Sequence, residues 1–107
     1  MGISKHLIWT LFLLSIIWIQ CQSDNGKREY SREEGKMIYK QFCITCHGAS
    51  GKLQTSGAAD LSQSDLGLKA RISIIENGKG AMTPFGNILT EQQIEAVARY
   101  TQTINTE

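Results

Sequence analysis

Apolar residues recur at helical spacing in three stretches of the chain. The first stretch opens with Ser31 and Glu34, which at this separation can each accept a hydrogen bond from the other's backbone N–H group. One helical face then carries Gly35, Tyr39, Phe42, Cys43 and Cys46. We expect a helix that starts at Ser31 and buries Tyr39 and Phe42 in the core.

The second stretch runs from Asp65 to Asn77. It places Leu68, Ile72 and Ile75 on one helical face, and Gly78 follows as a typical helix stop. Residues 71–74 also alternate between polar and apolar side chains, so a short strand is the open alternative there. We expect a helix over residues 65–77.

The third stretch has the strongest boundary signals. Thr90 and Gln93 have the spacing of a capping box, and Leu89 can pack against Ile94 across the helix start. The apolar face continues at helical spacing with Val97, Tyr100 and Ile104. We expect a helix from about Thr90 to Ile104.

The remaining segments define the domain organisation. Residues 48–59 are small and polar without an apolar period, which predicts a loop. No internal repeat is visible, and the chain after Cys21 is short enough to form one domain. We divide the chain into an export segment at residues 1–20, a flexible polar tether at 21–30 and a single domain at 31–107.

The N-terminal segment predicts export. Lys5 is followed by an apolar run at residues 7–19, which at about 1.5 Å per residue is short of the ~30 Å core of a bilayer. Cys21 follows this segment and is similar to the lipid-modified first residue of a bacterial lipoprotein. Because residues 18–20 fit a small-residue cleavage site poorly, an uncleaved anchor is the alternative.

The charges of the exported part are balanced. Removing Lys5, the only charged residue of positions 1–20, from the totals of 11 basic and 10 acidic residues leaves ten of each. Nucleic-acid binding therefore has no support. Three lysines, Lys52, Lys69 and Lys79, can either steer an acidic partner or serve as ordinary solvated surface residues.

Cys43, Cys46 and His47 form a C-x-x-C-H run, the spacing at which a chain attaches a c-type haem. On a helix the three side chains share one side, so two thiols can reach two vinyl groups while the imidazole reaches the iron. A structural zinc site needs four ligands, and a thioredoxin-like redox pair needs a βαβ setting. The run therefore predicts one haem c, held through Cys43 and Cys46, with a redox pair as the alternative.

Elimination suggests the second iron ligand. Haem iron is usually completed by His, Met, Cys or Tyr, and the only other histidine, His6, lies in the apolar N-terminal segment. Met1 starts the chain, and Met37 precedes Cys43 on the same predicted helix. Met82 lies in a glycine-rich loop that can pass over the opposite haem face, although it can also be a core residue.

From about Ser31 to Ile104 the chain resembles the class I c-type cytochromes. The resemblance is carried by Glu34-Gly35-Lys36, Tyr39, the run from Cys43 to Gly48, Asp60-Leu61, Asn77-Gly78, Met82, Pro84-Phe85-Gly86 and Tyr100. It implies an all-α fold of three to five helices wrapped around one covalently bound haem. It also implies His47 and Met82 as axial ligands, and a helix containing Gly35 that crosses a helix containing Tyr100.

The chain departs from the family pattern at two positions. Family members commonly have a proline directly after the methionine, where this chain has Thr83 before Pro84. They also tend to have a proline before the Asp-Leu pair, where this chain has Ala59. The family implies that the carbonyl of this residue accepts the ring N–H of the proximal histidine, and Ala59 retains that carbonyl.

These features predict a membrane-tethered electron carrier rather than an enzyme. We expect it on the periplasmic side of a bacterial membrane, lipid-anchored through Cys21, where it passes single electrons between an oxidase, dehydrogenase or reductase and other redox proteins. One alternative is a haem subunit of an oxidase or dehydrogenase complex. The other is a haem enzyme or gas sensor with a labile sixth ligand, at which the departure at Thr83 hints.

Overall fold

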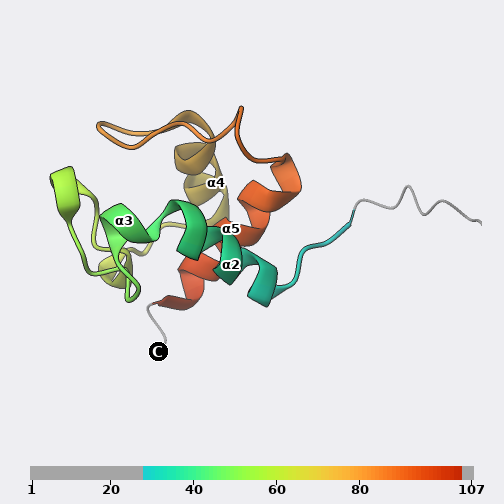
Figure 1. The fold of residues 1–107 in the computed structure, drawn as a ribbon, viewed down its shortest axis with the longest axis horizontal. Coiled ribbons are helices and arrows are strands. Elements are labelled where there is room, and N and C mark those ends of the chain that lie inside the picture. The colour runs from blue at the N-terminus through green and yellow to red at the C-terminus, as the bar shows by residue number, and fades with distance from the viewer. Residues whose placement is uncertain (1–27, 105–107) are drawn as a thin grey trace, which may run out of the picture.

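The computed structural model describes residues 28–104, which form helices joined by loops (Figure 1). The elements in chain order are α2 (Arg32–Phe42), α3 (Ile44–His47), η2 (Thr55–Gly57), η3 (Leu61–Gln63), α4 (Leu68–Asn77) and α5 (Glu91–Thr103). The described residues contain no extended strand, only an isolated bridge between Lys79 and Met82. The predicted all-α fold is confirmed.

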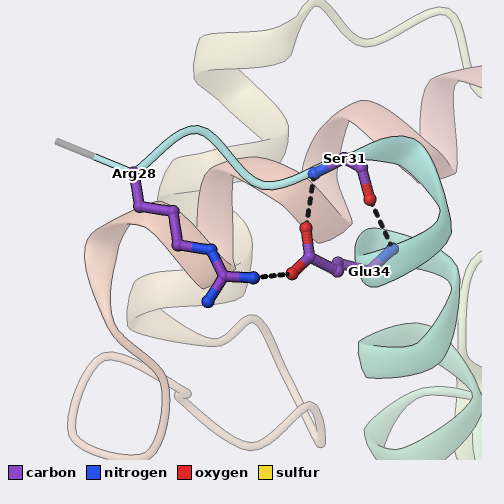
Figure 2. Close-up of polar contacts among 3 residues, drawn as sticks. All are labelled: Arg28, Ser31 and Glu34. Atoms are coloured by element: carbon purple, nitrogen blue, oxygen red, sulfur yellow. Dashed lines mark hydrogen bonds and ion pairs between the residues drawn. The ribbon is translucent and has the colours of Figure 1, made fainter. Parts of the chain in front are cut away.

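The predicted capping box starts α2. The Ser31 hydroxyl accepts the Glu34 backbone N–H at 3.3 Å, and the Glu34 carboxylate accepts the Ser31 N–H at 2.8 Å. Figure 2 shows that Arg28 also reaches back to pair with the same carboxylate. The hydrogen bonds with Ser31 and, to a smaller extent, the pairing with Arg28 lower the pKa of Glu34. Glu34 therefore stabilises the first turn of α2 and ties Arg28 to it.

The helix that starts at Arg32 does not run unbroken through the C-x-x-C-H run, as the apolar spacing suggested. It ends at Phe42, and Cys43 joins it to the single turn of α3 with φ −113°. The Cys46 N–H donates to the Cys43 carbonyl at 3.2 Å, a tighter turn than the α-helical one. As a result Cys46 is exposed, whereas Cys43 is half-buried against the core.

The helix predicted over residues 65–77 begins later, at Leu68, and the strand alternative is wrong. The later start of the helix is explained by Arg71. Its guanidinium donates to the backbone carbonyls of Ser64 and Leu66, each at 2.8 Å. Ser64 and Gly67 are consequently held in extended backbone conformations. The predicted stop at Gly78, which has φ +73°, is confirmed.

The helix α5 begins and ends where the sequence predicts. Thr90 and Gln93 form the capping box, and Ile104 is the C-cap. Leu89 and Ile94 are both buried in the core cluster. Both α2 and α4 pack against α5.

The helices α2 and α5 cross (Figure 1). Their backbones come closest at Gly35 of α2 and Ala96 of α5. A Cβ atom on Gly35 would overlap the backbone carbonyl of Ala96, which shows that the two backbones touch there. The crossing predicted between the Gly35 and Tyr100 helices is confirmed. One turn away, the rings of Tyr39 and Tyr100 pack with centroids 5.3 Å apart.

The N-terminal predictions concern a different part of the chain. The export segment at residues 1–20, His6, Cys21 and most of the tether lie outside the described residues. Among residues 28–104, no helix has the length and apolar character needed to cross a bilayer.

Candidate haem site

A cavity of about 440 Å³ lies between the C-x-x-C-H run, the loop before α4 and the glycine-rich loop after it. Its walls are predominantly apolar and include Phe42, Leu61, Ile74 and Phe85. This volume falls within the roughly 300–1,000 Å³ range of ligand and cofactor sites. The four residues predicted to hold a haem line this one cavity: Cys43, Cys46, His47 and Met82.

His47 is buried and its ring is fixed in one orientation. The ring Nδ1 lies 2.9 Å from the Ala59 carbonyl oxygen, as the family resemblance implied. A carbonyl oxygen can only accept, so Nδ1 carries the proton and the lone pair remains on Nε2. The His47 carbonyl accepts the Leu53 N–H at 3.0 Å, which also fixes the backbone. The imidazole is therefore prepared to bind a metal through Nε2.

The two thiols differ in their surroundings. Cys43 is half-buried, and burial, with a smaller contribution from Cys46, raises the pKa of its thiol to about 12. Cys46 is exposed at the rim. The described residues also contain no extended strand and therefore no βαβ unit, the setting that the thioredoxin-like alternative requires.

Met82 is carried by a loop whose two ends are anchored. The loop, residues 78–86, begins at Gly78, where a Cβ atom would lie only 2.5 Å from the Met82 carbonyl oxygen. At its other end the N–H groups of Phe85 and Gly86 donate to the last turn of α4 at 2.9 and 3.0 Å. Met82 itself is half-buried and bridges to Lys79. These contacts fix the loop backbone that carries Met82, and Met82 lines the cavity.

Tyr39 links α2 to the residue that follows His47. Its hydroxyl donates to the Gly48 carbonyl oxygen at 2.6 Å, which joins α2 to the residue after His47. Burial, followed by the nearby Cys43 and Tyr100, raises the pKa of Tyr39 well above its usual value. Tyr39 is thus a neutral hydrogen-bond donor in the core, which agrees with its interpretation as a packing residue.

Arg71 is the residue that sequence reasoning missed. It lines the cavity and is 5% exposed, and it donates to the backbone carbonyl and hydroxyl of Thr101, each at 3.2 Å. Burial lowers its pKa, and the nearby Asp65 carboxylate opposes that shift. Its spacing from Leu68 and Ile75 places it on the apolar face of α4, and this was the available signal for its burial.

The three lysines considered for partner steering, Lys52, Lys69 and Lys79, are exposed. Lys79 also borders the cavity. Steering by these residues stays a prediction.

The lining residues fit a haem. His47 offers a nitrogen lone pair, Met82 offers a thioether, and two thiols lie beside the histidine. Apolar side chains line the cavity walls between these groups. These are the donors that c-type haem sites use. The charged side chains at the cavity, Arg71 and Lys79, are both cationic and complement the carboxylates of a porphyrin.

Comparison with known proteins agrees with this fit. The family model described as cytochrome C oxidase, cbb3-type, subunit III matches residues 31–100. The chain is also similar to proteins named cytochrome c6. That of Gloeothece citriformis is 39% identical over 104 residues, which cover 90% of this chain and 87% of the relative.

Two further cytochrome c6 relatives match over a shorter region. That of Rippkaea orientalis is 42% identical over 72 residues, 62% of this chain, and the match spans just under two thirds (64%) of its own length. That of Leptolyngbya boryana is 36% identical over 72 residues, 62% of this chain and 84% of the relative.

Proposed function

Because this chain belongs to the class I c-type cytochromes, monohaem electron carriers with a covalently bound haem c, we propose that it passes single electrons between redox proteins from the described cavity. The observation that carries the proposal is the convergence of a C-x-x-C-H run and a loop-borne methionine on one apolar cavity. The family supplies the haem, whose iron changes reversibly by one electron.

The assignment of residues follows from the donors at the cavity. Cys43 and Cys46 would hold the haem as thioethers. His47, whose Nδ1–H donates a hydrogen bond to the Ala59 carbonyl, and Met82, which lines the same cavity, would supply the nitrogen and sulfur ligands of the iron. A thioether ligand raises the reduction potential relative to a second imidazole.

The surroundings suit electron transfer rather than catalysis. The cavity walls are predominantly apolar, and the anchored ends of the 78–86 loop restrain the backbone that carries Met82. If His47 and Met82 both bound the iron, no position would be left for a substrate, and ligands held in this way would need little rearrangement when the charge of the iron changes. The chain's own contribution is therefore to keep both ligands in place in either oxidation state.

The test is the visible spectrum of the haem-loaded protein, oxidised and reduced, with and without carbon monoxide. We expect a low-spin spectrum that carbon monoxide does not change, and loss of the sulfur-to-iron band in Met82→Ala. The matched control is Met37→Ala, because Met37 is 63% exposed on α2. A wild-type protein that binds carbon monoxide would instead favour an enzyme or a gas sensor.

Export and anchoring form the finer part of the proposal. The apolar run at residues 7–19 and the cysteine that follows it support an exported protein with a lipid on Cys21. A lipid-anchored carrier on the periplasmic side fits a place in a respiratory or dehydrogenase chain. In Cys21→Ser we expect the protein to move from the membrane fraction to the soluble fraction, whereas an unchanged distribution would contradict the lipid anchor.

A second candidate is a haem subunit of an oxidase or dehydrogenase complex. The description of the matching family model, which names an oxidase subunit, favours it. The match to the cytochrome c6 of Gloeothece citriformis, which covers 87% of that relative, favours the independent carrier. Purification in mild detergent separates the two, because a subunit is recovered in a stoichiometric complex and a carrier is recovered alone.

A further inference from the structure

Arg71 is a buried cation whose hydrogen-bond partners in the described part of the chain are all neutral. The side chain is only 5% exposed. Its guanidinium donates to the backbone carbonyls of Ser64, Leu66 and Thr101, and also to the Thr101 hydroxyl. These oxygens accept N–H groups, but none of them carries a negative charge. Because burying a cation without a counter-charge is costly, a buried arginine is normally paired with an anion.

The acid nearest in effect, Asp65, does not provide that pairing. Its charge opposes the lowering of the Arg71 pKa, but within the described residues no hydrogen bond or ion pair joins the two side chains. Asp65 is exposed, so solvent screens its charge. The pKa of Arg71 is still lowered, with burial as the largest cause. The described protein groups therefore compensate this cation only in part.

The guanidinium also has unused donor capacity beside the cavity. An arginine has five N–H groups, and the four acceptor oxygens named above leave at least one N–H without an acceptor among the described residues. Arg71 lines the cavity, and no Asp or Glu of the described residues lines it. The cavity wall thus presents a buried cation and supplies no anion, which is the pattern expected of a site for an anionic ligand group.

We propose that Arg71 binds a propionate carboxylate of the haem and is thereby the buried anchor of the cofactor's acidic edge. This inference rests on the proposed function, because it requires haem in the cavity. Lys79 is the other cation that lines the cavity, but it is exposed, so water can solvate its ammonium group without a carboxylate. The planar guanidinium also matches the geometry of a carboxylate better than an ammonium group does.

The contacts of Arg71 extend the effect of this anchor beyond the cavity. Arg71 lies on α4, and its bonds reach the loop before α4 and Thr101 on α5. Neither α4 nor α5 carries a residue predicted to attach the haem or to bind its iron. A carboxylate that neutralises Arg71 removes the cost of the buried charge in this network. Haem binding therefore stabilises the contact between α4 and α5.

The experiment uses the haem-loaded protein in its reduced, diamagnetic state. Proton NMR tests for a nuclear Overhauser contact between the Arg71 guanidinium and the propionate methylene groups. Resonance Raman measures the propionate bending band, whose frequency rises when the carboxylate accepts hydrogen bonds. Arg71→Met removes the charge and the donors but keeps an unbranched side chain, whereas Arg71→Lys keeps the charge. Lys79→Met is the matched control, because it removes the other cation that lines the cavity.

In the wild type we expect a contact between Arg71 and one propionate. The bending band should shift to lower frequency in Arg71→Met, and the shift should be smaller in Arg71→Lys because a charged donor remains. Lys79→Met should leave the band near its wild-type frequency. Absence of the wild-type contact would overturn the proposal, and so would a band that shifts further in Lys79→Met than in Arg71→Met.

A structural role of Arg71 alone predicts a different pattern. A lysine has a single nitrogen and cannot replace the bonds to Ser64, Leu66 and Thr101 together. If Arg71 acted only through those bonds, the band would shift as far in Arg71→Lys as in Arg71→Met, or in neither variant, and the proposal would be wrong. If Arg71→Met yields no haem-loaded protein, the wild-type contact alone decides.

The outcome also separates this inference from the function on which it rests. Wild-type protein that attaches no haem would refute the proposed function. Haem-loaded protein whose propionates show no contact with Arg71 would refute only the anchor.

Discussion

At the scale of single residues, the buried polar groups of the cavity wall each have a defined partner. The His47 Nδ1–H donates a hydrogen bond to the Ala59 carbonyl, and Arg71 donates to the carbonyls of Leu66 before α4 and Thr101 in α5. No buried side-chain nitrogen or oxygen of the described residues lacks a hydrogen bond. Because an unpaired buried polar group costs about 1–3 kcal/mol, changes at these residues should be costly even where no iron ligand is lost.

Tyr39→Phe tests this at one hydroxyl. The change removes the 2.6 Å bond to the Gly48 carbonyl oxygen, which retains only the longer bond from the Gly51 N–H at 3.2 Å, so we expect the free energy of unfolding to fall by about 1 kcal/mol. Guanidinium denaturation of the haem-loaded protein measures this free energy of unfolding. Tyr30→Phe is the control, because the Tyr30 ring, which packs against Arg28, retains that contact. Equal losses in both variants would contradict the argument.

At the scale of elements, the helices begin at side-chain caps and are joined by close backbone contact. Both α2 and α5 start with a capping box, and they meet where Gly35 lies against Ala96. The first feature depends on residues three positions apart, and the second depends on the absence of a side chain. Each can be perturbed separately.

Gly35→Ala tests the crossing of α2 and α5. The added methyl group would lie 2.9 Å from the Ala96 carbonyl carbon and must push the helices apart, so we expect a loss of about 1–3 kcal/mol in unfolding free energy. At Gly67 a Cβ atom would meet nothing within 4 Å, and Gly67→Ala should stay within about 1 kcal/mol of wild type. Gly35→Ala with wild-type stability would show that the crossing is not tight.

Glu34→Gln tests the cap of α2 through pH. The pKa of Glu34 is lowered from its ordinary 4.5 in the folded protein, so its contribution is present above about pH 4.5 and is lost as pH falls through the lowered value. Glutamine keeps the cap geometry but does not titrate. Carboxylates titrate between roughly pH 5 and pH 3. When the pH is lowered over this range, the free energy of unfolding of Glu34→Gln should therefore fall less than that of wild type. Parallel curves would contradict this.

At the scale of the whole molecule, the core is arranged around the cavity. The buried cluster joins α2, α4 and α5 through residues such as Ile38, Ile75 and Val97, while Phe42, Leu61 and Met82 are only partly buried and border the cavity. So short a chain has a limited core. Without haem the apolar walls would face water, and much of the apolar burial that stabilises the fold would be missing.

We therefore expect the Cys43→Ser/Cys46→Ser variant, which cannot attach haem covalently, to be largely unfolded. Far-UV circular dichroism compares it with the haem-loaded protein, and the wild-type spectrum should show the helices observed here. A helical spectrum with a cooperative thermal transition in the double variant would contradict this prediction, since the polypeptide would then fold on its own.

The sequence by itself determined the features whose partners lie within a few residues. The capping boxes at Ser31 and Thr90, the stop at Gly78 and the C-x-x-C-H spacing are readable because each depends on a separation of at most four residues. The resemblance to c-type cytochromes added the crossing of the Gly35 and Tyr100 helices and the bond from His47 to residue 59. The interpretation of Met82 as an iron ligand also came from the sequence and remains to be tested.

Only the tertiary structure decided where α4 begins and why Arg71 is buried. Arg71 bonds Thr101, which lies 30 positions further along the chain, and it draws the carbonyls of residues 64 and 66 out of helical geometry. Helical periodicity reports which residues share a face, but it does not report which distant backbone group will accept a hydrogen bond, because that depends on how the packed helices bring loops together.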